Sequence, residues 1–68
     1  MTTPTVVDIE VWTRTRVTAG DAITRYTILY TEDGKTYRVA TRETEFEARR
    51  VARAHHWVVG RVFNEEEL

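Results

Sequence analysis

Only one segment of this chain has the periodicity of a helix, and almost everything on either side of it alternates between apolar and polar residues. The segment is TEFEARRVARAHHW, residues 44–57, where small and apolar residues recur every three or four positions. Alternation with a period of two is typical of strands that bury one face. Because a single helix covers only one face of a small sheet, the sequence predicts an α+β domain with one covered and one open sheet face.

Four strands are expected, three before the helix and one after it. They occupy residues 6–17, 23–32, 36–41 and 58–63, with a turn at 18–22 between the first two. Asp33 and Gly34 separate the second and third strands, and this pair is typical of a type I′ hairpin turn, since both central residues of that turn need positive φ. The predicted order is β-β-β-α-β in a small, mainly antiparallel sheet. The last strand is expected to return parallel to the third through a right-handed crossover, at an edge that the pattern leaves open.

The predicted helix has a start signal and two distinct sides. Thr44 and Glu47 have the spacing of a capping box, in which each side chain bonds a backbone N–H of the other residue. At about 100° per residue, the side expected to pack on the sheet consists of Thr44, Ala48, Val51, His55 and Val58, flanked by Ala52 and Ala54. The opposite side carries Phe46, Arg49, Arg50, Arg53, His56 and Trp57.

The first candidate for binding a partner is the patch formed by Phe46, Arg50, Arg53 and Trp57 on the arginine-bearing side of the helix. Arginine stacks on aromatic rings, and both residue types are enriched at protein interfaces. The alternative is a role in the core. Phe46 lies in the first turn and Trp57 in the last, so either ring could fold towards the sheet, where so short a chain needs its large apolar groups.

The open face of the sheet is the second candidate. Six residues are expected on it: Trp12, Arg14 and Arg16 from the first strand, and Tyr26, Tyr30 and Arg38 from the second and third. Three uses of such a face are open, because it can be solvated, bind a partner or pair with a second copy of the chain. Homodimerisation would also add buried area to a small core.

Length and composition limit the remaining possibilities. The 68 residues suffice for a single domain, residues 1–68, with a frayed lead-in at 1–5 and an acidic tail at 64–68. The N-terminus does not resemble a signal peptide, and no apolar run approaches the length needed to cross a membrane. We therefore expect a cytoplasmic location and no membrane partner.

The residues that usually carry catalysis or bind metals are scarce. Serine and cysteine are absent, and the three glycines form no phosphate-binding loop. His55 and His56 are adjacent, so on a helix they point about 100° apart and do not face one metal ion. We expect no enzymatic activity, no metal site and no cofactor.

Two segments resemble known protein families. Residues 36–63 look like small phage-encoded accessory proteins built as a hairpin, a helix opened by T-x-x-E-A-x-x-[VL]-A, and a final strand, a group that includes a coliphage inhibitor of host RNA polymerase. The match is carried by Thr44, Glu47, Ala48, Val51 and Ala52. Residues 26–56 resemble in outline the arm-type DNA-binding domains of phage and transposon integrases. The first resemblance implies a protein that binds one host macromolecule, and the second implies a sheet that reads DNA.

The leading functional hypothesis is a small protein-binding module without enzymatic activity. As a phage accessory protein it would inhibit or redirect a host macromolecule in the host cytoplasm. One alternative is DNA or RNA binding through the arginine-bearing sheet face, which a net charge of −1 does not favour. The other alternative is a structural homodimer subunit with no further ligand.

Overall fold

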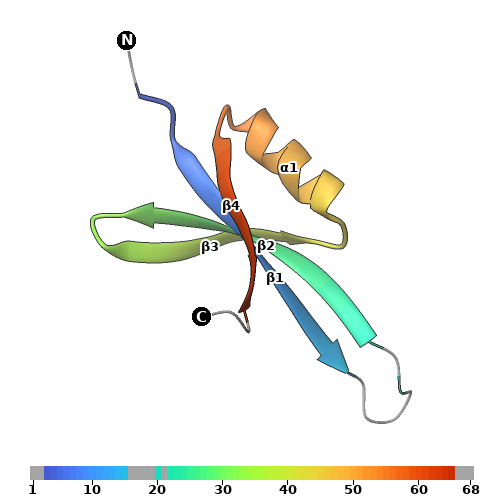
Figure 1. Ribbon diagram of the computed structural model, residues 1–68. Helices are drawn as coiled ribbons and strands as arrows, with labels where there is room; N and C mark the ends of the chain where they lie inside the picture. Colours follow the sequence, from blue (N-terminus) through green and yellow to red (C-terminus); the bar gives the residue numbers. More distant parts are fainter. Residues whose placement is uncertain (1–2, 16–19, 21, 66–68) are drawn as a thin grey trace.

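The protein folds as a four-stranded sheet with one helix packed on it (Figure 1). The computed structural model describes residues 3–15, 20 and 22–65. The elements are β1 (Val6–Thr15), β2 (Ala22–Glu32), β3 (Lys35–Arg42), α1 (Glu45–Ala54) and β4 (Val58–Asn64). This confirms the predicted α+β class and the β-β-β-α-β order.

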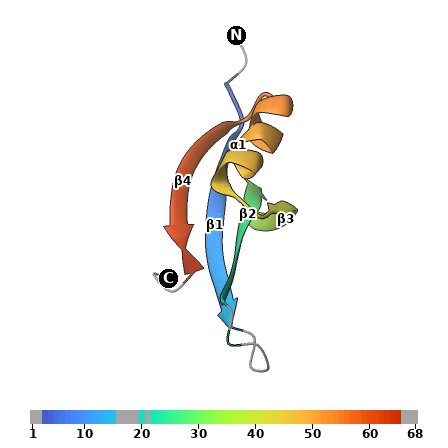
Figure 2. The same cartoon turned by 90° about the vertical axis from the view of Figure 1, so that its right-hand side faces the viewer.

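The strand order across the sheet is β3-β2-β1-β4. β2 is antiparallel to both of its neighbours, and β4 is parallel to β1. The chain therefore leaves β3 at one edge, passes through α1 and adds β4 at the opposite edge (Figure 2). β4 runs in the same direction as β3, as expected, and the structure assigns it the edge beside β1 that the sequence pattern had left open.

The two turns predicted before the helix are described to different extents. Asp33 and Gly34 both have positive φ, 52° and 79°, so the type I′ turn is confirmed. Gly20 also has a positive φ, 70°, within the expected turn at 18–22. The remainder of that turn, apart from Ala22 at the start of β2, lies outside the described residues, as do Arg16 and Val17.

The core lies on one face of the sheet, between the strands and α1. Its fully buried apolar side chains are Val7, Ile9 and Ile28 from the sheet, and Ala48 and Ala52 from the helix. The two alanines let the helix backbone lie close to the strands, as the predicted packing side required. Thr44 caps the helix, because its Oγ1 accepts the backbone N–H of Glu47 at 3.1 Å.

The register of β1 and β2 corrects one expectation about the open face. Tyr30 lies opposite Val7, and Tyr26 lies opposite Val11. Directly opposed residues in an antiparallel pair share a face, so both tyrosines lie on the helix-covered face and pack against the core. The prediction that they lie on the open face was wrong.

The helix ends earlier than its periodicity predicts. Its last residue is Ala54, and His56 takes a left-handed φ of 60°. His56 N–H then donates to the carbonyl of Arg53, and Trp57 N–H donates to the carbonyl of Ala52, both at 2.9 Å. These two bonds form a Schellman motif, with histidine in the position usually taken by glycine. The turn exposes His55 and ends the packing side before Val58, which is half-exposed on β4, so the prediction that these two residues pack beneath the helix was wrong.

Replacing His56 with glycine is expected to stabilise the protein by about 1 kcal/mol. A residue with a Cβ pays a steric penalty of about 1–2 kcal/mol in the left-handed region, and glycine does not, although glycine loses more chain entropy on folding. The measurement is the free energy of unfolding from urea titration. His56→Ala is the control: it removes the imidazole but keeps the Cβ, so it should not reproduce the gain.

Both hairpins extend beyond the part of the sheet that α1 covers (Figure 1). After the pairing of Val11 with Asn64, β1 has no neighbour except β2 among the described residues. At the opposite end, the hairpin of β2 and β3 continues past the last pairing with β1, at Tyr30. The molecule is accordingly long and thin, 52 × 24 × 15 Å along its principal axes.

Candidate functional site

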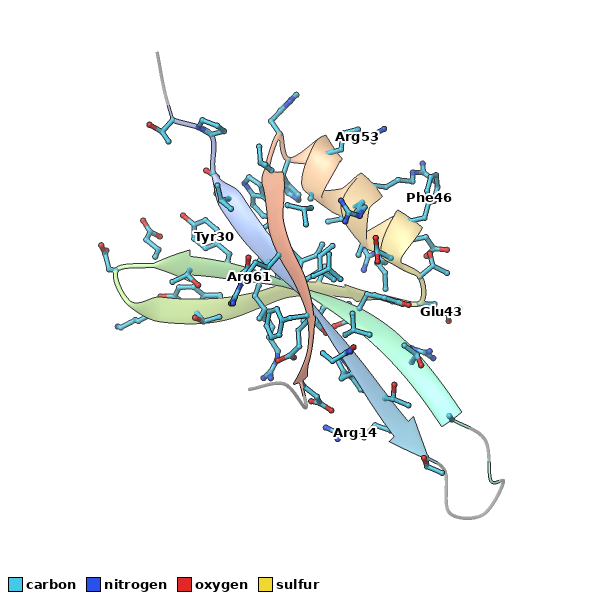
Figure 3. The ribbon with its side chains drawn as sticks, viewed as in Figure 1. Arg14, Tyr30, Glu43, Phe46, Arg53 and Arg61 are labelled. Atoms are coloured by element: carbon cyan, nitrogen blue, oxygen red, sulfur yellow. The ribbon has the colours of Figure 1, made fainter. Side chains whose placement is uncertain are left out.

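The outer side of α1 carries an exposed aromatic residue followed by two arginines. Phe46 is 71% exposed, the largest value among the large apolar residues that the structure describes. Arg50 and Arg53 are exposed and follow Phe46 by four and seven positions, so at about 100° per residue all three lie on the side opposite the buried Ala48 and Ala52. We call Phe46, Arg50 and Arg53 the helix ridge. Figure 3 shows Phe46 and Arg53 on α1, well apart from Arg14 and Arg61 on the strands.

Trp57, the fourth residue predicted for this patch, is not part of the helix ridge. The turn at His56 directs it towards the core, where it is half-buried. Its ring stacks on His55 at a centroid distance of 4.3 Å and on Tyr30 at 5.9 Å. The two candidate roles therefore divide between the two rings: Phe46 is exposed and Trp57 packs inside.

Tyr30 also lies near the acidic end of the β2–β3 hairpin. The carboxylate of Glu32, with smaller contributions from burial and from Asp33, raises the pKa of Tyr30 above its ordinary value. The tyrosine hydroxyl therefore stays protonated at neutral pH, and the ring next to Trp57 remains uncharged.

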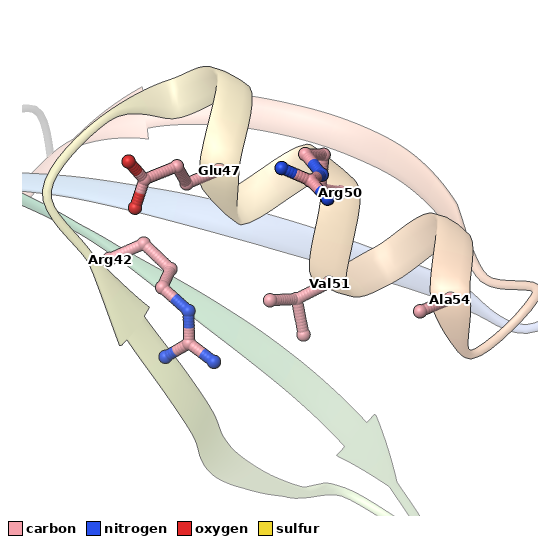
Figure 4. A pocket seen from close by; sticks show the side chains of 5 residues that line it. All are labelled: Arg42, Glu47, Arg50, Val51 and Ala54. Atoms are coloured by element: carbon pink, nitrogen blue, oxygen red, sulfur yellow. The ribbon is translucent and has the colours of Figure 1, made fainter.

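A shallow hollow of about 330 Å³ separates α1 from the end of β3. Figure 4 shows Arg42, from β3, facing the helix, with Glu47, Arg50 and Val51 around it. The side chain of Arg42 donates one hydrogen bond, to the carbonyl of Thr41 at 2.9 Å. Arg42 thus extends the positive surface of the helix ridge towards the sheet.

The arginines around the helix ridge differ in their ion pairing. Arg49 is paired with Glu45 at 2.8 Å, one turn earlier on the helix. Within the described part of the chain, Arg42, Arg50 and Arg53 have no carboxylate oxygen within 4 Å. Three guanidinium groups, two on the outer side of α1 and one across the hollow on β3, therefore have no carboxylate partner among the described residues.

On the open face, Trp12 and Arg14 lie where the sequence predicts them. The indole Nε1 of Trp12 donates to Thr27 Oγ1 at 2.8 Å, and Thr27 in turn is 3.0 Å from Thr41 Oγ1, so a chain of hydrogen bonds crosses three strands. The guanidinium of Arg14 lies 5.4 Å from the centre of the Trp12 ring and 3.7 Å from the Glu65 carboxylate. Arg16, the third predicted residue, is outside the described residues.

Two further arginines of the open face also lie beside carboxylates. Arg38 lies on this face, as predicted, and its guanidinium is 3.6 Å from the Glu10 carboxylate. Arg61 is 3.7 Å from the Asp8 carboxylate and 5.0 Å from the centre of the Phe63 ring. Asp8 also accepts the backbone N–H of Arg61 at 3.1 Å, next to the irregularity in the pairing of β1 with β4.

Sequence reasoning did not select the part of this surface that β4 contributes. Phe63 and Arg61 alternate with Val62 in the last strand, and this period of two was the available signal. Their face could be assigned only after the strand's edge and register were known. The pairing of β4 with β1 brings them beside Asp8 and Glu10.

Parts of the predicted lead-in at 1–5 and of the acidic tail at 64–68 are described. The carbonyl of Thr5 accepts the backbone N–H of Val58 at 2.8 Å, so the lead-in is attached to the start of β4. Asn64 is the last residue of β4, and Glu65 reaches Arg14 on the open face. Residues 1–2 and 66–68 lie outside the described residues.

Among residues 3–15, 20 and 22–65, no group of three or more His, Asp or Glu side chains is arranged to hold a metal ion. In the same part of the chain, α1 falls well short of the length and apolar character that crossing a membrane requires.

Comparison of the chain with protein-family models, with curated proteins and with solved structures found no match.

Proposed function

We propose that this protein is a small protein-binding module that inserts the helix ridge into an acidic groove of its partner. One observation carries the proposal: Phe46 is 71% exposed, and the two arginines that follow it along the outer side of the helix, Arg50 and Arg53, have no carboxylate partner among the described residues. An exposed aromatic residue beside arginines is the composition of an interface hot spot.

The chemistry of the ridge indicates the chemistry of the partner. Phe46 needs an apolar pocket, and Arg50 and Arg53 need carboxylates along one side of a helix-binding groove. The spacing of i, i+4 and i+7 is that of helices that bind in grooves. Arg42, across the hollow from Arg50, would add a fourth contact at the β3 flank.

Nucleic-acid binding through the open sheet face receives less support. Each arginine described there lies within 4 Å of a carboxylate: Arg14 with Glu65, Arg25 with Glu43, Arg38 with Glu10 and Arg61 with Asp8. A phosphate backbone would have to compete with these carboxylates, and its affinity depends on a net positive field. The same pairing does not affect the helix ridge.

Further parts of the proposal rest on the sequence. The chain has no serine or cysteine and only one adjacent pair of histidines, which supports a binding protein rather than an enzyme. A cytoplasmic location and a role as a phage accessory protein that inhibits or redirects a host macromolecule belong to the proposal through the family resemblance of residues 36–63. The resemblance concerns capping and packing residues, so it supports the fold of such a protein more than its target.

The test is affinity capture from a lysate of the natural host, followed by titration of the purified partner with wild-type and variant protein. Phe46→Ala is expected to weaken binding at least about 30-fold, because a central aromatic hot spot contributes about 2 kcal/mol or more. Arg50→Gln with Arg53→Gln should also weaken binding, with a loss that shrinks as salt is added.

Lys35→Gln serves as the control, because it removes one positive charge from the β2–β3 turn, far from the ridge. It should bind like the wild type. A partner that binds Phe46→Ala and the double arginine variant as tightly as the wild type would contradict the proposal. Capture of nucleic acid alone, with a steep loss of affinity in salt, would favour the alternative.

A further inference from the structure

The open face of the sheet has apolar side chains and hollows that no other element covers. Trp12, Leu29 and Phe63 are half-buried there without any element packed above them. Two adjoining hollows, of about 410 and 230 Å³, lie over this face and share Glu10 and Arg38 on their linings. α1 covers the other face, so nothing in the described chain fills these hollows.

The exposed area of the chain is larger than its mass requires. A folded monomer of 8.0 kDa is expected to expose about 4450 Å², whereas this chain exposes 5387 Å². Its radius of gyration is 13.4 Å, against about 11 Å expected for 68 residues. The excess area, roughly 900 Å², goes with the long, thin shape of the chain, and such a shape has room for a standard interface of roughly 800 Å² on one protein.

The charges of the open face suit a second copy of the same chain better than a partner whose surface is uniformly acidic or uniformly basic. The described part of this face has four ion pairs, in which Arg14, Arg25, Arg38 and Arg61 meet Glu65, Glu43, Glu10 and Asp8. A two-fold axis brings the same surface of two copies together, so such a surface must contain both signs to avoid repulsion. This face contains them in equal numbers.

The ion pairs of the open face are long, and their guanidinium groups are mostly exposed. Arg14, Arg38 and Arg61 approach their carboxylates at 3.6–3.7 Å, beyond the usual hydrogen-bond length. Glu10 is the clearest case, since its side chain is only 9% exposed and its partner Arg38 is 74% exposed. No buried side-chain oxygen among the described residues lacks a hydrogen-bond partner, so a guanidinium group of a second copy would shorten an existing ion pair at Glu10.

We propose that two copies of this chain associate through their open faces, related by a two-fold axis, with the helices on the outside. The half-buried rings of Trp12 and Phe63 then lie between two sheets spaced about 10 Å apart, as in sandwich packing. The assembly presents two helix ridges, one on each outer side. This inference does not depend on the helix ridge having a partner.

Sedimentation over a concentration range tests the association, with a matched pair of variants to locate it. Thr36 lines the larger hollow on the open face, and its hydroxyl is 3.1 Å from that of Thr31. Thr13 lies on the opposite face, the one that Val11 shares, and its hydroxyl is 3.2 Å from that of Thr24. Both threonines are exposed. Thr36→Lys places a bulky cation beside Arg38 and should raise the dissociation constant at least about tenfold, while Thr13→Lys should leave it unchanged.

The two tryptophans provide a second readout that needs no variant. Trp12 lies on the open face and Trp57 on the covered face, so their indole N–H signals report the two sides separately. Between dilute and concentrated samples, the NMR signal of the Trp12 indole is expected to shift and that of Trp57 to stay in place. The wild-type mass should rise towards twice 8.0 kDa over the same range.

Three results would overturn the proposal. The first is a mass that stays at 8.0 kDa at the highest soluble concentration. The second is an equal effect of Thr36→Lys and Thr13→Lys, which would indicate pairing through a sheet edge. The third is an indole shift at Trp57 without one at Trp12, which would place the contact on the helix side.

Discussion

Replacing Ile28 with alanine is expected to lower the free energy of unfolding by about 2–5 kcal/mol. Ile28 is fully buried at the centre of the helix-covered face, between Ile9 on β1 and Ala40 on β3. A chain of 68 residues is expected to have only about 3–10 kcal/mol of stability in total. The variant should therefore be partly or largely unfolded at room temperature.

Thermal unfolding followed by far-UV circular dichroism measures this effect. For a domain of this size each kcal/mol changes the midpoint by about 4–8 °C, so Ile28→Ala should lower it by at least about 10 °C. Ile28→Val is the graded control, since it removes a single methylene and should cost about 0.5–1.5 kcal/mol. If Ile28→Ala cost no more than Ile28→Val, the core would not lie where the structure places it. Both variants should be compared at one concentration, because association would also affect the midpoint.

The second large effect is expected at Trp57. Trp57→Ala should destabilise the protein by about 3 kcal/mol, the lower end of the range for removing a core aromatic, because the ring is only half-buried. The substitution removes the stacking contacts with His55 and Tyr30 at the end of the helix. It leaves a gap between the last turn of α1 and the strands.

Phe46→Ala is the matched control for Trp57→Ala. The two rings lie in the same predicted patch, but Phe46 is 71% exposed, so its removal should change the free energy of unfolding by no more than about 0.5 kcal/mol. Urea titration of both variants measures the difference. Equal losses of stability would mean that both rings serve the core, which would also remove the main support for the helix ridge as a binding surface.

The two proposals use opposite sides of the molecule and reinforce each other in one respect. A dimer formed through the open faces would carry two helix ridges pointing away from each other. If a partner offers two acidic grooves, binding of the first ridge raises the effective concentration of the second. If it offers one groove, the dimer can join two partner molecules.

Local features of the sequence were sufficient to predict the elements, the β2–β3 turn and the N-terminal cap of the helix. The type I′ turn depends on Asp33 and Gly34 alone, and the helix start depends on Thr44 and the backbone N–H of Glu47. The packing of Ala48 and Ala52 follows from their spacing along one helix. Each of these involves residues at most a few positions apart, so the sequence pattern contains all the information that is needed.

The candidate sites were harder to predict, because they depend on residues distant in sequence. The face of Tyr26 and Tyr30 follows from the register of β1 against β2, and a shift of one residue would have reversed it. The inward position of Trp57 follows from His56 adopting a left-handed conformation that no glycine signalled.

The amino-acid sequence by itself determined that this chain has four strands and one helix, and that aromatic residues and arginines alternate on surfaces the helix does not need for packing. Only the tertiary structure decided which of those arginines are available. Arg61 meets Asp8 and Arg38 meets Glu10 because β4 and β3 take particular places beside their neighbours, whereas Arg50 and Arg53 are exposed on α1 and have no carboxylate partner among the described residues. The reason is physical: helix and turn signals act over a few residues, whereas ion pairing depends on strand order and register, which the whole chain sets together.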